Sequence, residues 1–449
     1  MATIDDEFLG SDLGDERLDA RMLAIAPALA RDPELSFPEA LGDGAALEGA
    51  YRFFGNPAVA PGAILRPHLL ASAARVQAHK RVLVVHDTTK FVPTGNEPRD
   101  GIGVDGCFYG HFSLAVSADG RREPLGLLAL KTWTRLKKKG FRTTHVRKKE
   151  PDLESLRWLE QAIEAEAMVS GPELIHVEDR EGDIYDSLRQ RRDRGMHFIV
   201  RGQAKRTVDV DDEARNILEH MRQQPRLLKR QVTLSRRTVR ENRRWSYQSR
   251  EGRQATLAIA ACAIELRRPA RADESLPPTL ALNAVHVIEV DLAEDEEAVE
   301  WLLLTTEPTG TSAEIEFVVD SYRARWTIEE YFKALKSGCA YESRQLGTYD
   351  GMLRALSIFA VIAWRLLLMR TLARDGTRVA ASTILSATEL QVLQAQGLVD
   401  ETIRGALTAI AALGGHLKNN GDPGWEVIWR GFRTLRIMAS GFLLGAAKK

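Results

Sequence analysis

The region between residues 81 and 202 constrains the fold most, because short apolar runs alternate there with amphipathic stretches. Runs of this kind predict buried strands, and the stretches between them have the spacing of helices. The expected strands are residues 81–89, 111–117, 125–130, 174–179 and 197–202, the second and third joined at Asp119-Gly120. Strands that alternate with helices after an opening hairpin predict a mixed α/β sheet.

The segments on either side have a different pattern. Three stretches of helical spacing before residue 77 predict a small N-terminal helical region. From Leu227 to about Thr305 the pattern is that of successive strands, and after Glu314 it is mostly helical. The apolar run from Ala355 to Trp364 is about half a membrane span, so we expect a buried helix there.

The charge balance is neutral overall but uneven. Lys+Arg and Asp+Glu both number 62, and zero net charge by itself argues against nucleic-acid binding, because DNA-binding domains are usually basic. Residues 1–50 carry a net charge of −9 and residues 289–300 carry −7, whereas 131–149 and 201–270 carry +9 each. A solvated surface accounts for most single charge runs. Two long basic blocks that also contain aromatic residues favour a polyanionic partner.

Three widely separated cysteines, Cys107, Cys262 and Cys339, argue against a disulfide framework and against a zinc site built on cysteine. The N-terminal sequence MATIDDEFLG has acidic residues where a secretory signal has a basic start and an apolar run. We therefore expect a cytoplasmic protein that does not associate with a membrane.

Two aspartates end predicted buried strands. Asp87 and Asp179 both stand at a carboxyl end, the edge at which open α/β sheets place ligands. Two carboxylates that converge there suit Mg²⁺, which takes oxygen ligands and retains water for a substrate phosphate. The plainer interpretation is two solvated strand-end aspartates, which 62 acidic residues make unsurprising.

The segment DSYRARWTIEEYFKALK predicts one continuous helix with a polar face. At about 100° per residue, four polar residues of this segment share an arc of roughly 60°. These residues are Tyr322, Arg325, Glu329 and Lys336, and the residues on the opposite side are Ala324, Ile328, Tyr331 and Leu335. The common interpretation of such a polar arc is a solvated helix face with an Arg–Glu ion pair. A third carboxylate beside two cations also suits two-metal phosphodiester chemistry.

Four motifs carry a resemblance to a known family. They are HDTTK at Asp87, VEDREGDIYDSL at Asp179, EWLLLTTEP at Trp301 and the pattern Tyr322-x2-Arg325-x3-Glu329-x6-Lys336. In this order the chain resembles DDE transposases of bacterial insertion sequences, and more narrowly the cut-and-paste, hairpin-forming subgroup with a Tyr–Arg–Glu–Lys signature. LGDERLDAR and EGAYRFFGNPAV resemble that family's end-binding region, and the segment from Trp425 to Phe442 resembles its dimerisation helices.

The resemblance implies an α/β fold with an RNase H-like catalytic core, a β-rich insertion, and N-terminal and C-terminal helical domains. The expected parts are a DNA end-binding domain (1–70), the first part of the core (71–203), the β-rich insertion (204–305), the second part of the core with the glutamate helix (306–368) and a dimerisation domain (369–449).

By the same resemblance Asp87, Asp179 and Glu329 form the catalytic, metal-binding triad. Asp87 is expected to bridge two Mg²⁺ ions, and Asp179 and Glu329 to hold one each, with Mn²⁺ able to substitute. One ion serves the attacking water or DNA 3′-hydroxyl, and the other serves the leaving oxygen.

Further residues are expected to contact DNA. The resemblance assigns phosphates near the transposon end to Tyr322, Arg325 and Lys336. Trp301 matches the position that stacks a flipped base during hairpin formation, although a tryptophan in the core is the ordinary interpretation of an apolar strand. The expected end-binding region departs from the family by being acidic, and its first cations are Arg17 and Arg21.

Three other residues near these motifs are expected to be structural. His86 and His111 are interpreted as buried histidines with satisfied hydrogen bonds. Asp183 is interpreted as a supporting or helix-start residue outside the triad.

The expected function is Mg²⁺-dependent cut-and-paste transposition, in which a homodimer on two transposon ends nicks, forms and resolves hairpins, and joins the ends to target DNA. One alternative is a related nuclease without strand transfer. Another is a catalytically silent protein that binds transposon ends as a regulator. The intact triad argues against the silent alternative, because binding alone does not need all three carboxylates.

Overall fold

A computed structural model describes residues 4–95, 98–135, 154–234, 252–292, 298–374, 379–398, 400–417 and 423–446. It divides into two compact units. The first consists of Met1–Leu153, Gln161–Pro172 and Trp326–Lys449, and the second of Glu154–Glu160 and Glu173–Arg325. Most of the first basic block, part of the second and part of the acidic stretch before Trp301 lie outside the described residues.

The first unit contains a three-stranded antiparallel sheet in the order β3–β2–β1. Its strands are β1 (Arg81–Phe91), β2 (Phe108–Ser117) and β3 (Pro124–Trp133). The predicted hairpin is confirmed, and Gly120 in its turn has a φ of 88°, a conformation that glycine adopts without strain. One expectation is wrong: β1 continues to Phe91, so Asp87 lies within the strand and not at its end.

The described part of the first unit also contains helices. They are α1 (Glu16–Arg31), α2 (Phe37–Leu41), α3 (Gly44–Gly55), α4 (Pro61–Val76), α10 (Trp326–Lys333), α11 (Tyr349–Arg374), α12 (Ala387–Ala395), α13 (Ile403–Leu413) and α14 (Trp425–Ala446). The expected N-terminal helices are confirmed, and α1 begins where Asp15 accepts a hydrogen bond from the Arg17 N–H.

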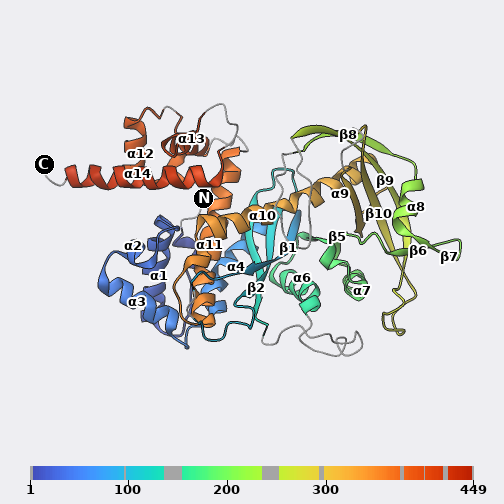
Figure 1. Cartoon of the computed structure of the whole chain (residues 1–449), viewed down its shortest axis with the longest axis horizontal. Helices are drawn as coiled ribbons and strands as arrows, with labels where there is room; N and C mark the ends of the chain where they lie inside the picture. The colour runs from blue at the N-terminus through green and yellow to red at the C-terminus, as the bar shows by residue number, and fades with distance from the viewer. Residues whose placement is uncertain are drawn as a thin grey trace. The chain divides into compact units, whose positions relative to one another are not determined.

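The central helix of the first unit is α11, which lies alongside α4 and also contacts β3 and α13 (Figure 1). It is long and apolar enough to cross a membrane by length and composition alone. Most of its apolar side chains, including those from Ala355 to Trp364, are buried against these neighbours. The predicted buried helix is therefore confirmed as the core of this unit.

The second unit contains a mixed sheet in the order β4–β5–β11–β10–β9–β6–β7, with β8 also paired to β9. Its strands are β4 (Glu173–Glu178), β5 (His197–Arg201), β6 (Thr207–Val210), β7 (Glu213–Asn216), β8 (Leu228–Leu234), β9 (Arg253–Arg267), β10 (Thr279–Val290) and β11 (Glu300–Thr305). Only β4 and β5 pair in parallel among the pairings described in this unit.

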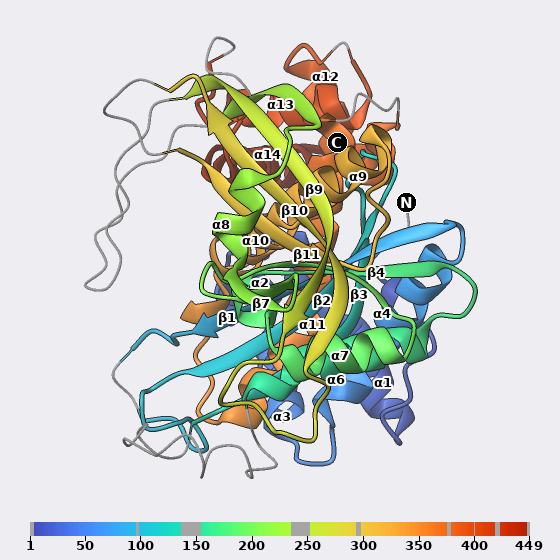
Figure 2. The ribbon, with the colours of Figure 1, turned by 90° about the vertical axis from the view of Figure 1, so that its right-hand side faces the viewer.

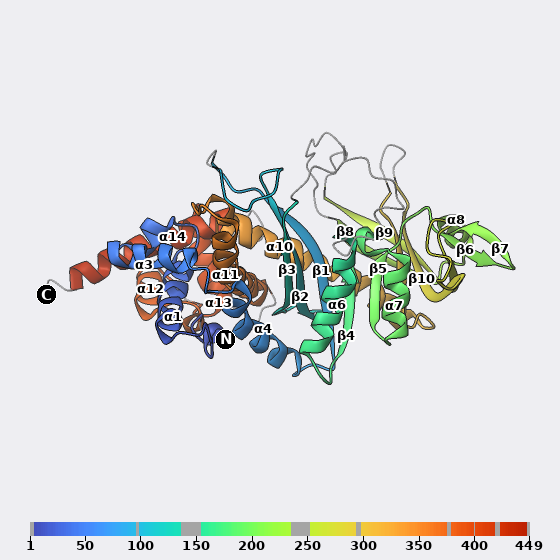
Figure 3. The same cartoon turned by 90° about the horizontal axis from the view of Figure 1, so that it is seen from below.

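The β-rich segment extends the sheet that β4 and β5 begin. β11 pairs antiparallel with β5, and β9 and β10 run side by side with α8 (Ile217–Gln223) against them (Figure 2). The short strands β6 and β7 form the outer edge of this sheet (Figure 3). The chain also contains α7 (Tyr185–Asp193) and α9 (Ser312–Ala324) in this unit, and α6 (Arg157–Met168), which both units share.

The predicted continuous glutamate helix is instead interrupted. α9 ends at Ala324, α10 begins at Trp326, and a π-helical turn, η4 (Ala334–Gly338), follows α10. The apolar side of the prediction is confirmed, because Ala324, Ile328, Tyr331 and Leu335 are all buried. A π-turn adds a residue per turn, so the ideal helical angle no longer places Lys336.

Candidate active site

Asp87 lies on β1 in a half-buried position opposite Phe112 of β2. Its Oδ1 accepts a hydrogen bond from the Thr88 N–H at 2.7 Å. The strand before it, from Val82 to His86, is buried, so the apolar run fixes where the carboxylate emerges from the sheet. The position of Asp87 could be predicted from the sequence because the continuous apolar run of β1 ends just before it.

Two buried histidines flank Asp87. The Ser113 hydroxyl lies 3.0 Å from Nδ1 of His86, and the Thr88 hydroxyl lies 2.8 Å from Nδ1 of His111. The two imidazole rings lie nearly parallel, with centroids 5.8 Å apart. As expected, both histidines are buried, and the contacts of their Nδ1 atoms link β1 and β2 on either side of the carboxylate.

Glu329 stands on α10, which packs against β1 in the same unit. Its side chain is half-buried. The sequence places Glu329 beside the buried Ile328, so the apolar side of the helix attaches to the sheet and turns the neighbouring position outward. The elements that carry Asp87 and Glu329 are therefore in direct contact.

Lys336 also reaches β1. Its ammonium group donates a hydrogen bond to the carbonyl of Lys90 and lies 3.5 Å from the Glu342 carboxylate and 5.2 Å from the centre of the Phe91 ring. These contacts hold a cation on the strand three residues beyond Asp87. The structure brings Lys336 to β1 through the π-turn, by a route that ideal helical spacing does not describe.

Asp179 belongs to the second unit and follows β4 directly, as predicted. Its Oδ1 accepts the Glu181 N–H at 2.8 Å and so begins the short helix η3 (Arg180–Gly182). Just before it, the Glu178 carboxylate is fully buried and receives two hydrogen bonds from Arg191, at 2.7 and 3.0 Å. This ion pair fixes the end of β4 from which Asp179 projects.

Asp183 has a structural task in the same unit. Its carboxylate accepts hydrogen bonds from Arg206 at 2.7 and 3.0 Å and from the Gln203 N–H at 2.8 Å. The side chain is buried. These bonds tie the start of α7 to the chain that follows β5, which is the supporting role expected of Asp183.

Trp301 and Tyr322 are neighbours in the second unit. Their rings make an edge-to-face contact with centroids 5.6 Å apart. Trp301 is half-buried on β11, whereas only 5% of Tyr322 is exposed. The expectation that Tyr322 lies on an open polar face is therefore wrong, because the ring packs against Trp301. Arg325 follows directly, at the end of α9.

Arg17 and Arg21 are both exposed on α1. The segment before this helix is anchored by Glu7, which contacts His68 and Arg75 on α4 at 2.5 and 2.7 Å. Burial raises the pKa of the Glu7 carboxyl, but its hydrogen bonds and charge interactions with His68 and Arg75 outweigh that effect and lower it. An ionised buried carboxylate thus holds the acidic N-terminal segment to the unit.

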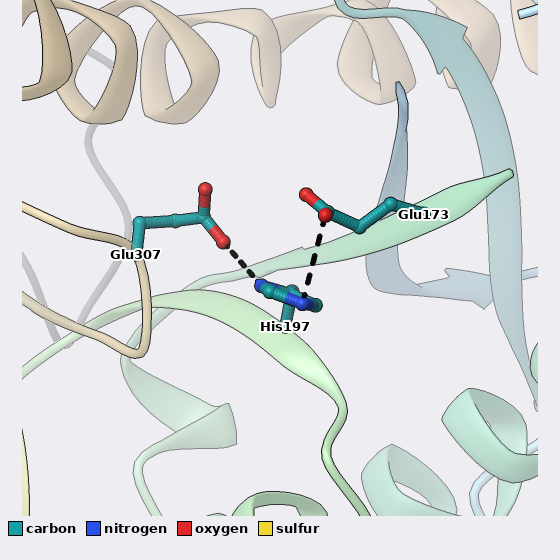
Figure 4. A group of neighbouring side chains, drawn as sticks. All are labelled: Glu173, His197 and Glu307. Carbon is teal, nitrogen blue, oxygen red and sulfur yellow. Dashed lines mark hydrogen bonds and ion pairs between the residues drawn. The ribbon is translucent and has the colours of Figure 1, made fainter. Parts of the chain in front are cut away.

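One group of ligand-type side chains was not predicted from the sequence. Glu173, His197 and Glu307 meet in the second unit, with the imidazole between the two carboxylates (Figure 4). These residues are 24 and 110 positions apart, so no local spacing could have revealed them. The sequence indicated only that His197 begins a predicted strand.

Two family models match the chain. The Transposase DNA-binding model matches residues 1–59, and the Transposase DDE domain model matches residues 181–365. The chain therefore contains a region similar to a transposase DNA-binding domain and a region similar to a transposase DDE domain. Its mixed sheet with flanking helices is consistent with an RNase H-like core, so the predicted fold class is confirmed.

The two matches support a DNA-binding transposase that depends on a divalent metal. The DDE match covers Trp301, Tyr322, Arg325, Glu329 and Lys336, and it begins two residues after Asp179. Asp87 lies between the two matched regions. Asp87 and Glu329 belong to the first unit and Asp179 to the second, so the joining of these three carboxylates in one site stays a prediction.

Proposed function

We propose that this transposase moves an insertion sequence by a cut-and-paste mechanism, with Asp87, Asp179 and Glu329 as its catalytic carboxylates. The observation that carries the proposal is the packing of α10 on β1, because it joins the elements of Asp87 and Glu329 within one unit. The DNA-binding and DDE domain matches supply the substrate class.

The proposed ligands fit Mg²⁺ by the chemistry of their donors. All three are half-buried carboxylates, and Mg²⁺ prefers oxygen ligands while retaining part of its water shell. Half-burial suits this ion, since a fully buried carboxylate would leave no room for water or a DNA phosphate. Bound in a pair, such ions activate the attacking oxygen and stabilise the leaving oxygen, and Mn²⁺ is expected to substitute.

The other residues of the proposed site would hold the DNA. The ammonium group of Lys336, which contacts β1 beyond Asp87, is proposed to bind a phosphate near the reacting bond. Arg325 is proposed to contact a second phosphate, with bidentate geometry that suits phosphate oxygens. Tyr322 is proposed to act indirectly and not by binding a phosphate itself: its buried ring supports the indole of Trp301.

Trp301 is proposed to stack a base that has been turned out of the duplex during hairpin formation. Its half-buried indole has an aromatic neighbour along one edge, which limits how the ring can move. Stacking on a fixed aromatic surface returns part of the energy that unstacking a base costs.

Paired transposon ends imply a symmetric complex, and we propose a homodimer in the synaptic complex. We propose that α1, with Arg17 and Arg21 exposed, contacts the terminal repeat, and that target DNA is a second substrate. We further propose that the protein acts in the cytoplasm.

The deciding experiment is transposition in vitro with Mg²⁺ and a plasmid that carries the terminal repeats of the protein's own element. Asp87→Asn, Asp179→Asn and Glu329→Gln should each reduce cleavage and strand transfer by roughly a thousandfold or more, since losing about 4 kcal/mol of charge stabilisation has that effect on a rate. Binding to the transposon ends, measured by mobility shift, should persist.

Glu330→Gln is the matched control. Glu330 is the next residue on α10, and its carboxylate contacts Arg374 at 3.3 Å and Arg370 at 3.5 Å. This variant should keep normal rates. A Glu329→Gln protein that cuts as well as Glu330→Gln removes Glu329 from the triad. Wild-type excision without insertion identifies a nuclease, and end-binding without cleavage identifies a regulator.

A further inference from the structure

Glu300 is the first residue of β11 and directly precedes Trp301. The end of a strand is where its pairing opens most easily, so the contacts of Glu300 matter for the residue that follows it. Successive side chains on a strand point to opposite faces of the sheet, which places Glu300 and Trp301 on opposite faces. His286 is paired with Leu302 in the β10–β11 ladder and therefore shares the face of Glu300.

The Glu300 carboxylate is held by two side chains from different elements. Arg222 of α8 donates to both oxygens, from Nε at 2.9 Å and from a terminal nitrogen at 2.8 Å. Nε2 of His286 lies 2.8 Å from Oε1. Burial raises the pKa of the Glu300 carboxyl, but its bonds to Arg222 and His286 outweigh burial and lower it. A bidentate guanidinium and a second donor fix the orientation of an ionised carboxylate as well as its position.

His286 is itself fixed by a third partner. Its ring is fully buried, and a terminal nitrogen of Arg226 lies 3.0 Å from Nδ1. A guanidinium can only donate hydrogen bonds, so Nδ1 accepts and the ring proton is on Nε2, which donates to Glu300. Burial and the neighbouring guanidinium groups lower the pKa of His286 in spite of Glu300, so the ring keeps this arrangement at neutral pH. The direction of each bond toward Glu300 is thus determined.

The backbone at Trp301 is held as well. The Arg201 guanidinium donates to the Glu300 carbonyl at 3.3 Å, and Trp301 is paired with Val287 of β10. On the other face of the sheet, the Trp301 ring makes its edge-to-face contact with Tyr322. The indole is half-buried, so part of its surface stays accessible. The Glu300 contacts therefore fix the start of β11 from the face that does not carry the indole.

We propose that Glu300 is a positioning residue for Trp301, and that Arg222 and His286 act on the indole through it. The inference rests on the proposed base-stacking role of Trp301. A base gains most from stacking on a ring that is already held in place, because ordering the ring on binding costs free energy. Without the Glu300 contacts β11 stays paired with β5 through Leu303–Thr305, but Trp301 at its start gains freedom.

Loss of these contacts is expected to alter one step of the reaction and not the fold. The side chains of Arg222 and Glu300 are 50% and 24% exposed, and ion pairs open to solvent contribute little to stability. In the proposed reaction nicking precedes the turning-out of a base, so nicking does not need the indole. The two steps therefore separate positioning of Trp301 from a general effect on the protein.

The test uses the full chain, Mg²⁺ and transposon-end duplexes of the protein's own element, in which 2-aminopurine replaces one base near the cleaved end. Its fluorescence rises when the base leaves the duplex stack and is quenched when it stacks on indole. At the position that is turned out, Trp301→Ala should be brighter than the wild type. Glu300→Ala should be bright like Trp301→Ala, form hairpins at least about fivefold more slowly than the wild type, and nick within about twofold of the wild-type rate.

Further variants separate positioning from damage to the unit. Arg222→Met should be slowed in hairpin formation like Glu300→Ala. Arg222→Lys keeps the positive charge but not the bidentate geometry, and should recover part of the rate that Arg222→Met loses. Arg215→Met, which breaks an exposed pair with Glu213 in the same unit, is the control and should match the wild type. All these variants should melt close to the wild-type temperature.

Three outcomes would overturn the inference. If Glu300→Ala matches the wild type in fluorescence and hairpin formation while Trp301→Ala is slow, Glu300 does not position the indole and the proposed function stands. An equal loss of nicking and hairpin formation in Glu300→Ala assigns Glu300 to the general stability of the unit. Normal hairpin formation by Trp301→Ala, or none by the wild type, removes the base-stacking role itself and the inference with it.

Discussion

The orientation of each candidate site residue depends on the groups that contact its side chain. Asp87 and Asp179 both come after buried apolar runs, and each of their carboxylates accepts a nearby backbone N–H, at 2.7 and 2.8 Å. Such bonds orient a carboxylate without neutralising it, which suits a ligand that must also meet a metal ion. Trp301 and Tyr322 show the same dependence in another form, since each ring limits the other's freedom.

Trp301→Ala tests the proposed base-stacking role. The variant should nick transposon ends at nearly the wild-type rate but form hairpins at least about tenfold more slowly, because the loss of stacking on one base costs about 1–3 kcal/mol. Nicked and hairpin products are separated on denaturing gels. Tyr322→Phe keeps the edge-to-face contact and should behave like the wild type, whereas equal hairpin formation by Trp301→Ala would return Trp301 to a purely structural role.

Glu7→Gln tests the anchor of the N-terminal segment and its pH dependence. Removing the charge from a buried ion pair should lower the free energy of unfolding by about 3 kcal/mol at neutral pH. The pKa of Glu7 lies below its usual 4.5, so its contribution is complete above that pH and is lost as the pH falls below it. Denaturation between neutral pH and pH about 3 should therefore show the variant and wild type converging.

The control for this comparison is Glu48→Gln. Glu48 forms an exposed pair with Arg52 on α3, and 65% of its side chain is accessible. Exposed pairs contribute about 0.5 kcal/mol or less, so this change should leave stability nearly unaltered. A constant stability difference between Glu7→Gln and wild type across the acid range would contradict an ionised Glu7.

At the level of elements, α11 connects the N-terminal helices to the remainder of its unit. Arg354 on α11 is buried, and its guanidinium donates to the carbonyl of Val59 at 2.6 Å and to that of Phe54 at 2.9 Å. The Ser357 hydroxyl donates to the Pro61 carbonyl at 2.8 Å. These bonds satisfy carbonyl groups where α3 ends and α4 begins, so the helix holds the segment matched as a DNA-binding domain.

Arg354→Met should lower the free energy of unfolding by about 2–4 kcal/mol, because two buried carbonyls lose their donors and each costs about 1–3 kcal/mol. Chemical denaturation measures the loss. Arg374→Met, at the end of α11, is the control: its guanidinium is 40% exposed and contacts Glu330, and its removal should cost about 1 kcal/mol or less. Equal losses in both variants would mean that Arg354 does not anchor α3.

At the level of the whole molecule, the charge distribution explains how a neutral chain can bind DNA. The two blocks of +9 are compensated by acidic stretches elsewhere in the sequence, so the net charge of zero conceals strong local fields. DNA responds to charges within about a Debye length, which is about 8–10 Å in physiological salt. A neutral net charge therefore does not argue against nucleic-acid binding by this chain, and the Transposase DNA-binding match supports such binding.

Replacing Lys137, Lys138 and Lys139 with glutamine tests the first basic block, which lies outside the described residues. If all three contact phosphates, the slope of log K against log salt should become shallower by about 2.7, at about 0.9 for each contact. Fluorescence anisotropy at several salt concentrations gives the slope. Lys80→Gln, at an exposed lysine outside both blocks, should leave it unchanged. An unaltered slope in the triple variant would exclude the block from the DNA interface.

The sequence by itself determined the kind and order of the elements, because hydrophobic periodicity and caps act over a few residues. The run Val82–Val85 predicted β1, stretches of helical spacing predicted the N-terminal helices, and Asp179 was correctly placed at the end of β4. The DDE-transposase resemblance also came from local motifs, and the two family matches support it.

Tertiary structure alone decided which distant residues meet. Pairing with β2 carries β1 beyond Asp87, packing against Trp301 buries Tyr322, and the π-turn directs Lys336 onto Lys90. Strand register brings His197 to Glu307 across 110 positions. These contacts depend on register and on packing between elements, whose energies come from partners far along the chain, and local periodicity carries no information about those partners.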